Sequence, residues 1–274
     1  MKTRLPRGAM AMAMAAGLCG GCDALESRAK EVVPRASSTG GAADESSRVP
    51  GNAPEFLRAL QPFPAPNLRL HYTMAGPGGL RGELTIDTAE GGFRRQEWSM
   101  TAKGMDGDTA MTRGLTIETP RWKWTRGEGD APARFVVRPL DLIARGYVAK
   151  SPAVRRAIFA TIRQWHEDLR RSRLEHPGDT ELVAGETCLR TRVAAQTLCL
   201  WEASALPLRY ESAEFTLQVT EIQRPASVPA DLYHVDGAPA DFPGGGLENA
   251  EILLRDLEAG NYAGLATALA SPLL

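Results

Sequence analysis

Two hydrophobic spacings succeed each other along the chain. Between residues 68 and 126, apolar and polar positions alternate with a period of two, which is the pattern of strands with one buried face. Glycine-rich turns separate these segments, as in an antiparallel meander. The strands expected from this pattern cover residues 68–74, 80–87, 93–102, 111–119 and 121–126.

Helical spacing of three and four begins after Phe135-Val136-Val137. Residues 140–149 are expected to form a first helix. Ser151-Pro152 supplies an N-cap and an N1 proline for a second helix, which ends at His176-Pro177-Gly178. The second helix carries a continuous apolar stripe, made of Val154, Ile158, Ile162, Trp165 and Leu169.

A second group of strands follows, and short helical segments flank the whole. We expect these later strands at residues 180–193, 197–203, 206–210 and 215–221, with a last extended contact to the sheet at 228–233. A short helix is expected at 55–60, and a helical tail at 247–258 and 262–270. Strands in antiparallel runs around two helices predict an α+β fold.

The amino terminus looks like that of a bacterial lipoprotein. Three basic residues precede a short apolar run, and Gly20-Gly21 stand directly before Cys22. We predict a signal peptide over residues 1–21, acylation of Cys22 with palmitate-type chains, and a flexible tether over 22–54. The aliphatic position of the usual motif holds Cys19, so ordinary secretory cleavage and an uncleaved anchor stay open as alternatives. The apolar run is shorter than the ~20 residues that span a bilayer.

Cysteine content is consistent with a place in the cell envelope, either facing the periplasm or at the surface, and net charge argues against nucleic acid. Removing residues 1–21 takes away three basic groups, so the formal net charge moves from −1 to −4, and nucleic acid is not an expected partner. Cys188 and Cys199 lie 11 residues apart in neighbouring strand-like segments. In an oxidising envelope they can form a disulfide worth ~2–3 kcal/mol, or remain two buried thiols.

Three segments resemble the bacterial lipoprotein-carrier (LolA/LolB-like) superfamily at the level of fold. They are Val183-Ala184-Gly185-Glu186-Thr187-Cys188, Cys199-Leu200-Trp201-Glu202 and Leu206-Pro207-Leu208-Arg209-Tyr210. The resemblance covers roughly residues 55–236 and leaves 237–274 as a carboxy-terminal helical tail. It implies a curved antiparallel β half-barrel with helices covering the concave face.

The resemblance also implies an apolar space that accepts acyl chains. The helix stripe would line it, together with strand residues such as Leu84, Ile86, Trp98, Trp122 and Trp124. The alternative is that all these side chains pack the core, as any α+β domain requires. The cavity arginine of the carriers has no counterpart that we can match, so lipoprotein transfer is not expected.

Motifs for catalysis or metal binding break at specific positions. His166-Glu167 begins a zinc-protease helix, but the place of its second histidine holds Arg170, so we interpret His166 as a solvated residue. No catalytic residue, metal ligand or cofactor is predicted. Arg156, Arg163 and Arg170 recur every seventh residue; we interpret them as a solvated face, with attraction of phospholipid head groups as the alternative.

The sequence thus leads to one principal function and one alternative. The principal hypothesis is a non-enzymatic envelope lipoprotein, held to the membrane by its acyl chains, that binds a lipid-like or other hydrophobic small molecule. The alternative is a structural or sensory protein-interaction module at the envelope with no ligand cavity, whose partner the sequence does not identify. An enzyme whose catalytic residues form no linear motif stays open as a third hypothesis.

Overall fold

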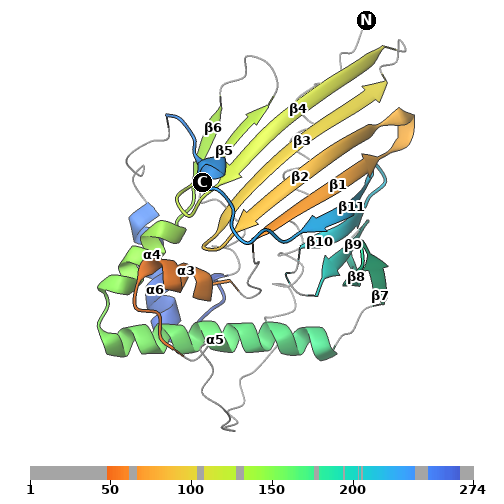
Figure 1. The fold of residues 1–274 in the computed structure, drawn as a ribbon. Coiled ribbons are helices and arrows are strands. Elements are labelled where there is room, and N and C mark those ends of the chain that lie inside the picture. The colour runs from red at the N-terminus through yellow and green to blue at the C-terminus, as the bar shows by residue number, and fades with distance from the viewer. Residues whose placement is uncertain are drawn as a thin grey trace, which may run out of the picture.

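The protein is an α+β structure built on one large antiparallel sheet (Figure 1). The computed structural model describes residues 48–61, 67–103, 108–127, 133–175, 179–193, 195–202, 204, 206–237 and 246–265. The predicted signal peptide, Cys22, most of the tether and the tail beyond residue 265 lie outside these ranges. No helix within them is both long and apolar enough to cross a membrane.

Eleven strands form the sheet, in the order β6-β5-β4-β3-β2-β1-β11-β10-β9-β8-β7. The first six are β1 Leu68–Ala75, β2 Arg81–Ala89, β3 Phe93–Lys103, β4 Thr109–Glu118, β5 Trp122–Gly127 and β6 Arg134–Val137. The other five are β7 Thr180–Val183, β8 Glu186–Val193, β9 Gln196–Trp201, β10 Pro207–Glu211 and β11 Thr216–Gln223.

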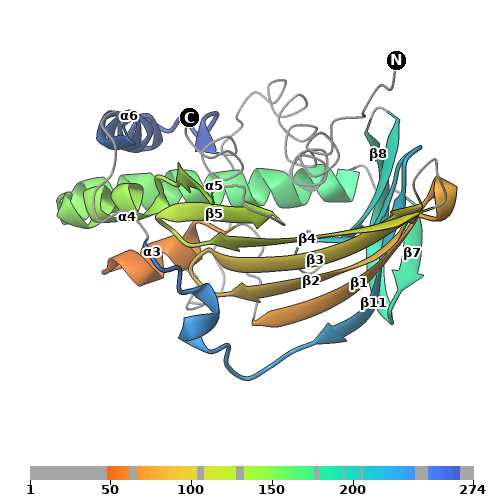
Figure 2. The same cartoon turned by 90° about the horizontal axis from the view of Figure 1, so that it is seen from above.

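Two meanders meet at the centre of this sheet, where β1 pairs antiparallel with β11. Tyr72 of β1 stands opposite Val219 of β11, and its hydroxyl donates a hydrogen bond of 2.9 Å to the backbone oxygen of Pro207. The outermost strands β6 and β7 do not pair with each other, so the sheet is open. Figure 2 shows the strands as an arc with helix α5 across its open side. The predicted fold class is confirmed.

In the described ranges, four α-helices accompany the sheet: α3 Ala53–Ala59, α4 Leu140–Ala149, α5 Pro152–Glu175 and α6 Gly246–Glu258. Helix α3 begins two residues before the predicted start because Asn52 caps it, accepting a hydrogen bond of 2.9 Å from the backbone N–H of Glu55. The Glu55 carboxylate in turn accepts a hydrogen bond of 2.6 Å from the backbone N–H of Gly51. These contacts fix the path of the chain into the helical layer.

The hydrophobic core divides into two clusters. One lies in the sheet and takes its buried side chains from strands and their turns, among them Leu70, Leu84, Ile86, Leu198 and Leu217. The other lies between the four helices, among them Phe56, Tyr147, Ile158, Ile162 and Leu254. Thr161 of α5 ties this layer to α6, because its hydroxyl donates a hydrogen bond of 2.7 Å to the backbone oxygen of Leu257.

The predicted single strand over residues 180–193 is wrong, because a tight turn divides it into β7 and β8. The turn is formed by Ala184 and Gly185, whose φ angles of 50° and 82° are both positive. A two-residue hairpin loop matches the strand twist best when both central residues have positive φ. Glycine adopts this conformation without strain, and Ala184 is the one non-glycine residue with positive φ in the described chain.

The segment around residues 228–233 also differs from its prediction as an extended contact. It ends in a 3-10 helix, η3 Ala230–Tyr233, rather than in a strand. The ring of Tyr233 packs on Phe93 of β3, with 5.4 Å between the ring centroids. A buried aromatic side chain, not backbone pairing, therefore attaches this segment to the sheet.

The disulfide between Cys188 and Cys199 is present and joins the neighbouring strands β8 and β9. Both cysteines are buried, at 0% and 2% exposure, within the sheet cluster. The predicted pairing is confirmed, because antiparallel strands bring these two positions within reach of one another.

Candidate functional site

The apolar stripe predicted on the long helix faces other helices. Ile158 and Ile162 of α5 are fully buried, and Trp165 is 7% exposed, all in the cluster formed with α3, α4 and α6. Val154 and Leu169 pack at the margin of the same cluster. The stripe therefore fills a helical core.

The strand residues proposed to line the same space lie elsewhere. Leu84 and Ile86 of β2 are buried in the sheet cluster, and Trp98 of β3 packs against it as the cross-strand partner of Leu84. Among the residues that the structure describes, the helical cluster contains no strand residue and the sheet cluster contains no α-helical residue. The structure thus does not bring the stripe and these strand residues into one cluster.

The two tryptophans of β5 point to the opposite face of the sheet. Trp124 stands opposite Ile117 of β4, and Ile117 stands opposite Arg95 of β3. Arg95 in turn aligns with Asp87, the residue after Ile86. Because successive side chains in a strand alternate between faces, Trp122 and Trp124 lie on the face away from Ile86.

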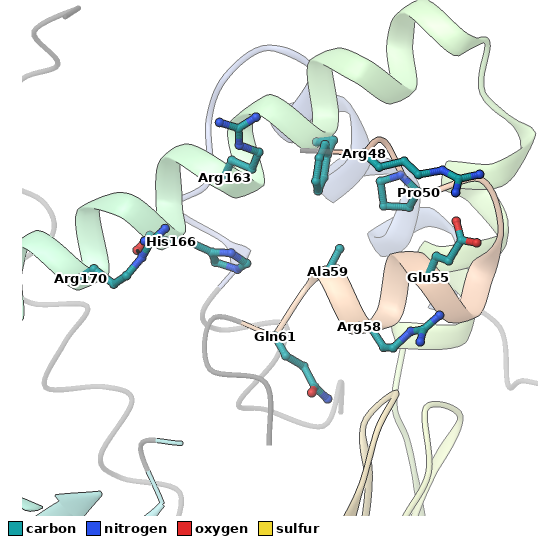
Figure 3. Close-up of a pocket in the computed structure, with 10 residues that line it drawn as sticks. Arg48, Pro50, Glu55, Arg58, Ala59, Gln61, Arg163, His166 and Arg170 are labelled. Atoms are coloured by element: carbon teal, nitrogen blue, oxygen red, sulfur yellow. Dashed lines mark hydrogen bonds between the residues drawn. The ribbon is translucent and has the colours of Figure 1, made fainter. Parts of the chain in front are cut away.

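A pocket of about 500 Å³ lies between α3 and α5 (Figure 3). Its apolar lining consists of Pro50, Ala59 and Phe159. Its polar lining, as far as the chain is described, contains one carboxylate, an amide, an imidazole and four guanidinium groups: Glu55, Gln61, His166, Arg48, Arg58, Arg163 and Arg170. Figure 3 shows Arg48 and Arg58 on the α3 side of this pocket and Arg163 and Arg170 on the α5 side. We call it the arginine pocket.

Helical periodicity explains how α5 supplies half of the arginine pocket. Phe159, Arg163, His166 and Arg170 follow each other at spacings of four, three and four. This row is the apolar stripe shifted by one residue, so it runs beside the stripe on the same helix. Burial of the stripe against the other helices orients the row toward α3.

The arginines of the pocket have weak partners. Arg58 lies 3.4 Å from Glu90, and the two side chains are 53% and 61% exposed. Arg163 lies 3.9 Å from Glu167, one turn further along α5, and both are about half exposed. Exposed ion pairs of this kind contribute at most ~1 kcal/mol, so both guanidinium groups can turn toward a ligand.

The one carboxylate in the lining has its own hydrogen bonds. The backbone N–H of Gly51 lowers the pKa of Glu55, and the Asn52 side chain and the charges of Arg48 and Arg58 act in the same direction. Glu55 is therefore ionised at neutral pH, and the lining carries four positive charges and one negative charge.

His166 corrects our interpretation of it as a solvated residue. Burial lowers its pKa to about 4; a hydrogen bond to the Leu60 backbone opposes this shift, and the Arg170 charge adds to it. The imidazole is thus neutral at pH 7. Its Nε2 atom is buried and makes no hydrogen bond within the described part of the chain. A neutral ring that donates through one nitrogen presents the other as an acceptor.

A second hollow, of about 800 Å³, lies over strands β2 to β5 and includes Trp98. Its charged lining residues are Glu83, Glu97, Arg113 and Arg126, so the two signs balance. This hollow has no preference for either sign of ligand charge. The arginine pocket is therefore the site with the more definite chemistry.

This pocket was not predicted from the sequence, because Arg163 and Arg170 were interpreted as part of a solvated face. The signal in the sequence was the four-residue row beside the stripe, in which an aromatic residue and a histidine accompany two arginines. The contribution of α3 carried no such signal. The structure also places Arg156, the third member of the arginine repeat, outside the pocket lining and exposed.

Comparisons with known proteins identify no family for this chain. No family model matches the chain, and no curated protein gives a significant match. Among solved structures, the complex of Pseudomonas aeruginosa MucA and MucB is similar with a TM-score of 0.26 and 15% identity. The match covers 67% of this chain and 60% of that chain, which is less than two thirds of its length. A TM-score this low supports no statement about fold or function.

Proposed function

We propose that the protein is a non-enzymatic envelope lipoprotein that binds a lipid-like ligand, and that the ligand occupies the arginine pocket. The observation that carries this proposal is the mixed lining, in which Phe159, Pro50 and Ala59 lie among four arginines. Ligand pockets commonly enclose ~300–1,000 Å³, and the volume of about 500 Å³ falls in this range. An amphiphile satisfies both parts of such a lining.

The place in the envelope rests on the sequence and is compatible with the disulfide. Oxidising compartments outside the cytoplasm permit a disulfide such as Cys188–Cys199 to persist. Acylation of Cys22 would tether the domain through residues 22–54 to the membrane that supplies the ligand. The resemblance to the lipoprotein-carrier superfamily agrees with a lipid-like ligand and belongs to the same proposal.

Native mass spectrometry of the full chain extracted from bacterial membranes tests the binding function. We expect a bound lipid mass, and a higher unfolding midpoint when the ligand is added back. Recovery of the chain without any lipid, together with no thermal stabilisation by added lipids or fatty acids, contradicts the proposal.

Metabolic labelling with palmitate tests the anchor separately. The full chain should incorporate the label, and Cys22→Ser should abolish it. Cys19→Ser is the matched control and should leave incorporation unchanged. An unlabelled chain would overturn the lipoprotein assignment while leaving the ligand proposal standing.

Exposed apolar side chains favour a second candidate, the protein-interaction module. Val148 of α4 and Ile252 of α6 are 37% and 42% exposed on two helices that pack together. Deleting the tail would also remove Leu254 and Leu257 from the helical core, so single-site crosslinking is the sharper test. A discrete crosslinked product in cell envelopes from position 252, and none from the exposed Leu182, supports an interaction surface. Equal labelling from both positions contradicts it.

A further inference from the structure

We infer that the arginine pocket recognises a phosphate group that carries a neighbouring hydroxyl. This inference rests on the proposed function, because it names the chemistry of the ligand in the same pocket. It also gives a role to His166, Arg163 and Arg170, which were interpreted from the sequence as solvated residues.

The lining of the arginine pocket is far more positive than the chain as a whole. The whole chain is close to neutral, with a formal net charge of −1, yet the pocket lining carries four arginines and one glutamate. One arginine fork matches a single carboxylate, so several arginines around one pocket suit a group with more oxygens and a more delocalised charge. Phosphate is the common biological group with these properties.

Arg58 comes from α3, whereas Arg163 and Arg170 come from α5, so both helices contribute arginines to the lining (Figure 3). Their carboxylate partners, where present, are exposed and 3.4–3.9 Å away. An anion that enters the pocket therefore replaces weak contacts with shorter, charge-assisted hydrogen bonds.

The Nε2 atom of His166 is buried without a partner in the described chain, and a neutral imidazole nitrogen of this kind accepts a hydrogen bond. A buried acceptor without a donor is unfavourable by ~1–3 kcal/mol. A hydroxyl beside the phosphate, as in a glycerol head group, supplies that donor once the imidazole turns toward the pocket, because Nε2 itself has no exposed surface here. Phe159 on the same row offers an apolar contact to the carbon atoms between them.

The test uses calorimetric titration of the full chain with Cys22→Ser, so that no detergent is needed. The probes are dihexanoylphosphatidylglycerol below its micelle concentration, glycerol 3-phosphate, and dihexanoylphosphatidylcholine, which has a phosphate but a quaternary ammonium and no head-group hydroxyl. We expect the phosphatidylglycerol probe to bind at least tenfold more tightly than the phosphatidylcholine probe, with an affinity that falls as salt rises.

The two anionic probes separate the sources of the phosphate. Tighter binding of the phosphatidylglycerol probe than of glycerol 3-phosphate identifies a lipid head group as the ligand. Equal affinities identify a soluble phosphorylated polyol. Both results support the inferred chemistry. Absence of binding by both anionic probes, or equal affinity for the phosphatidylglycerol and phosphatidylcholine probes, overturns it.

Variants assign the binding to the pocket. Arg163→Gln combined with Arg170→Gln should weaken binding of the anionic probe at least tenfold, whereas Arg156→Gln on the same helix should retain wild-type affinity. Arg58→Gln on α3 gives an independent loss if the double variant is unstable by its unfolding midpoint. A loss as large in Arg156→Gln, or none in the pocket variants, overturns the inference.

The outcomes keep this inference distinct from the proposed function. A neutral lipid found by native mass spectrometry, with no anionic probe bound, refutes the phosphate chemistry and leaves lipid binding intact. Anionic probe binding lost in the pocket variants, without any lipid recovered from membranes, supports the pocket chemistry and contradicts the lipid-binding function.

Discussion

At the scale of the residue, one helical position separates a structural role from a binding role on α5. Ile162 and Trp165 are buried in the helical core, whereas their neighbours Arg163 and His166 line the arginine pocket. A shift of one residue turns a side chain by about 100° around the helix axis, which is enough to change what it faces. The helical spacing of α5 therefore contains both the buried apolar stripe and the row that lines the arginine pocket.

His166 should make the stability of the fold depend on pH. Its pKa is about 4 in the folded protein and near 6.5 when unfolded, so the unfolded chain binds more protons between these values. The free energy of unfolding should therefore fall as the pH drops through this window, by ~1–2 kcal/mol between pH 7.5 and pH 5. Urea unfolding of wild type and His166→Gln measures the effect.

In the variant this part of the pH dependence should disappear, while the difference from wild type should be constant above pH 7.5. A wild-type pH dependence in His166→Gln contradicts the assignment. Burial of the imidazole is the main cause of the effect, and the Arg170 charge adds to it. The other charged groups that line the same pocket are Arg48, Glu55, Arg58 and Arg163.

At the scale of the element, local sequence chemistry decides the turns and the strand pairing near them. Ala184-Gly185 makes the β7–β8 hairpin, and the disulfide crosses from β8 to the next strand, β9. Cys188 stands opposite Trp201, and Cys199 stands opposite Arg190, so the bond links diagonal positions of one strand pair. It fixes the register of these strands near the open edge of the sheet.

Removing the disulfide should destabilise the sheet. Cys188→Ala with Cys199→Ala should lower the free energy of unfolding by ~2–4 kcal/mol, because the unfolded chain regains the freedom of the closed loop and two buried side chains lose contacts. Denaturant unfolding measures this loss. The matched control is wild type in reducing agent: the two losses should be similar, and an unchanged midpoint in both would show that the bond contributes nothing.

At the scale of the whole molecule, the order of elements along the chain does not match their order in space. Strand β1, the first in the sequence, pairs with β11, the last, and the helices α4 and α5 are inserted between the edge strands β6 and β7. The two meanders thereby form one sheet, while the helices gather into a layer with its own core. Among the described residues, a ligand in the arginine pocket would contact α5, α3 and the short segments directly before and after α3.

Because the core is divided into two clusters, substitutions in different clusters should have additive effects on the free energy of unfolding. Ile86→Val in the sheet cluster and Ile162→Val in the helical cluster should each lower the unfolding free energy by ~1 kcal/mol. Their effects should add within ~0.5 kcal/mol, since the two sites share no cluster. Chemical denaturation of wild type, both single variants and the double variant gives the double-mutant cycle that measures this additivity. The control is the pair Ile158→Val and Ile162→Val, which lie in one cluster. If the coupling energy between Ile86→Val and Ile162→Val is as large as in this control pair, the two cores are not energetically separate.

The sequence by itself determined the elements and several local features. Period-two and helical spacing located most strands and the helices 140–149 and 152–175, because burial of one face imposes that period on any strand or helix. It also indicated the disulfide, since two cysteines in adjacent strands are close whatever else the chain does.

Only the tertiary structure decided what the buried faces contact. The stripe of α5 was equally compatible with a sheet or with other helices, because an apolar face does not specify its partner. The approach of α3 to α5 joins residues more than 100 positions apart, such as Arg58 and Arg163, and creates the arginine pocket. Long-range contacts of this kind depend on the packing of the whole layer, so no local pattern contains them.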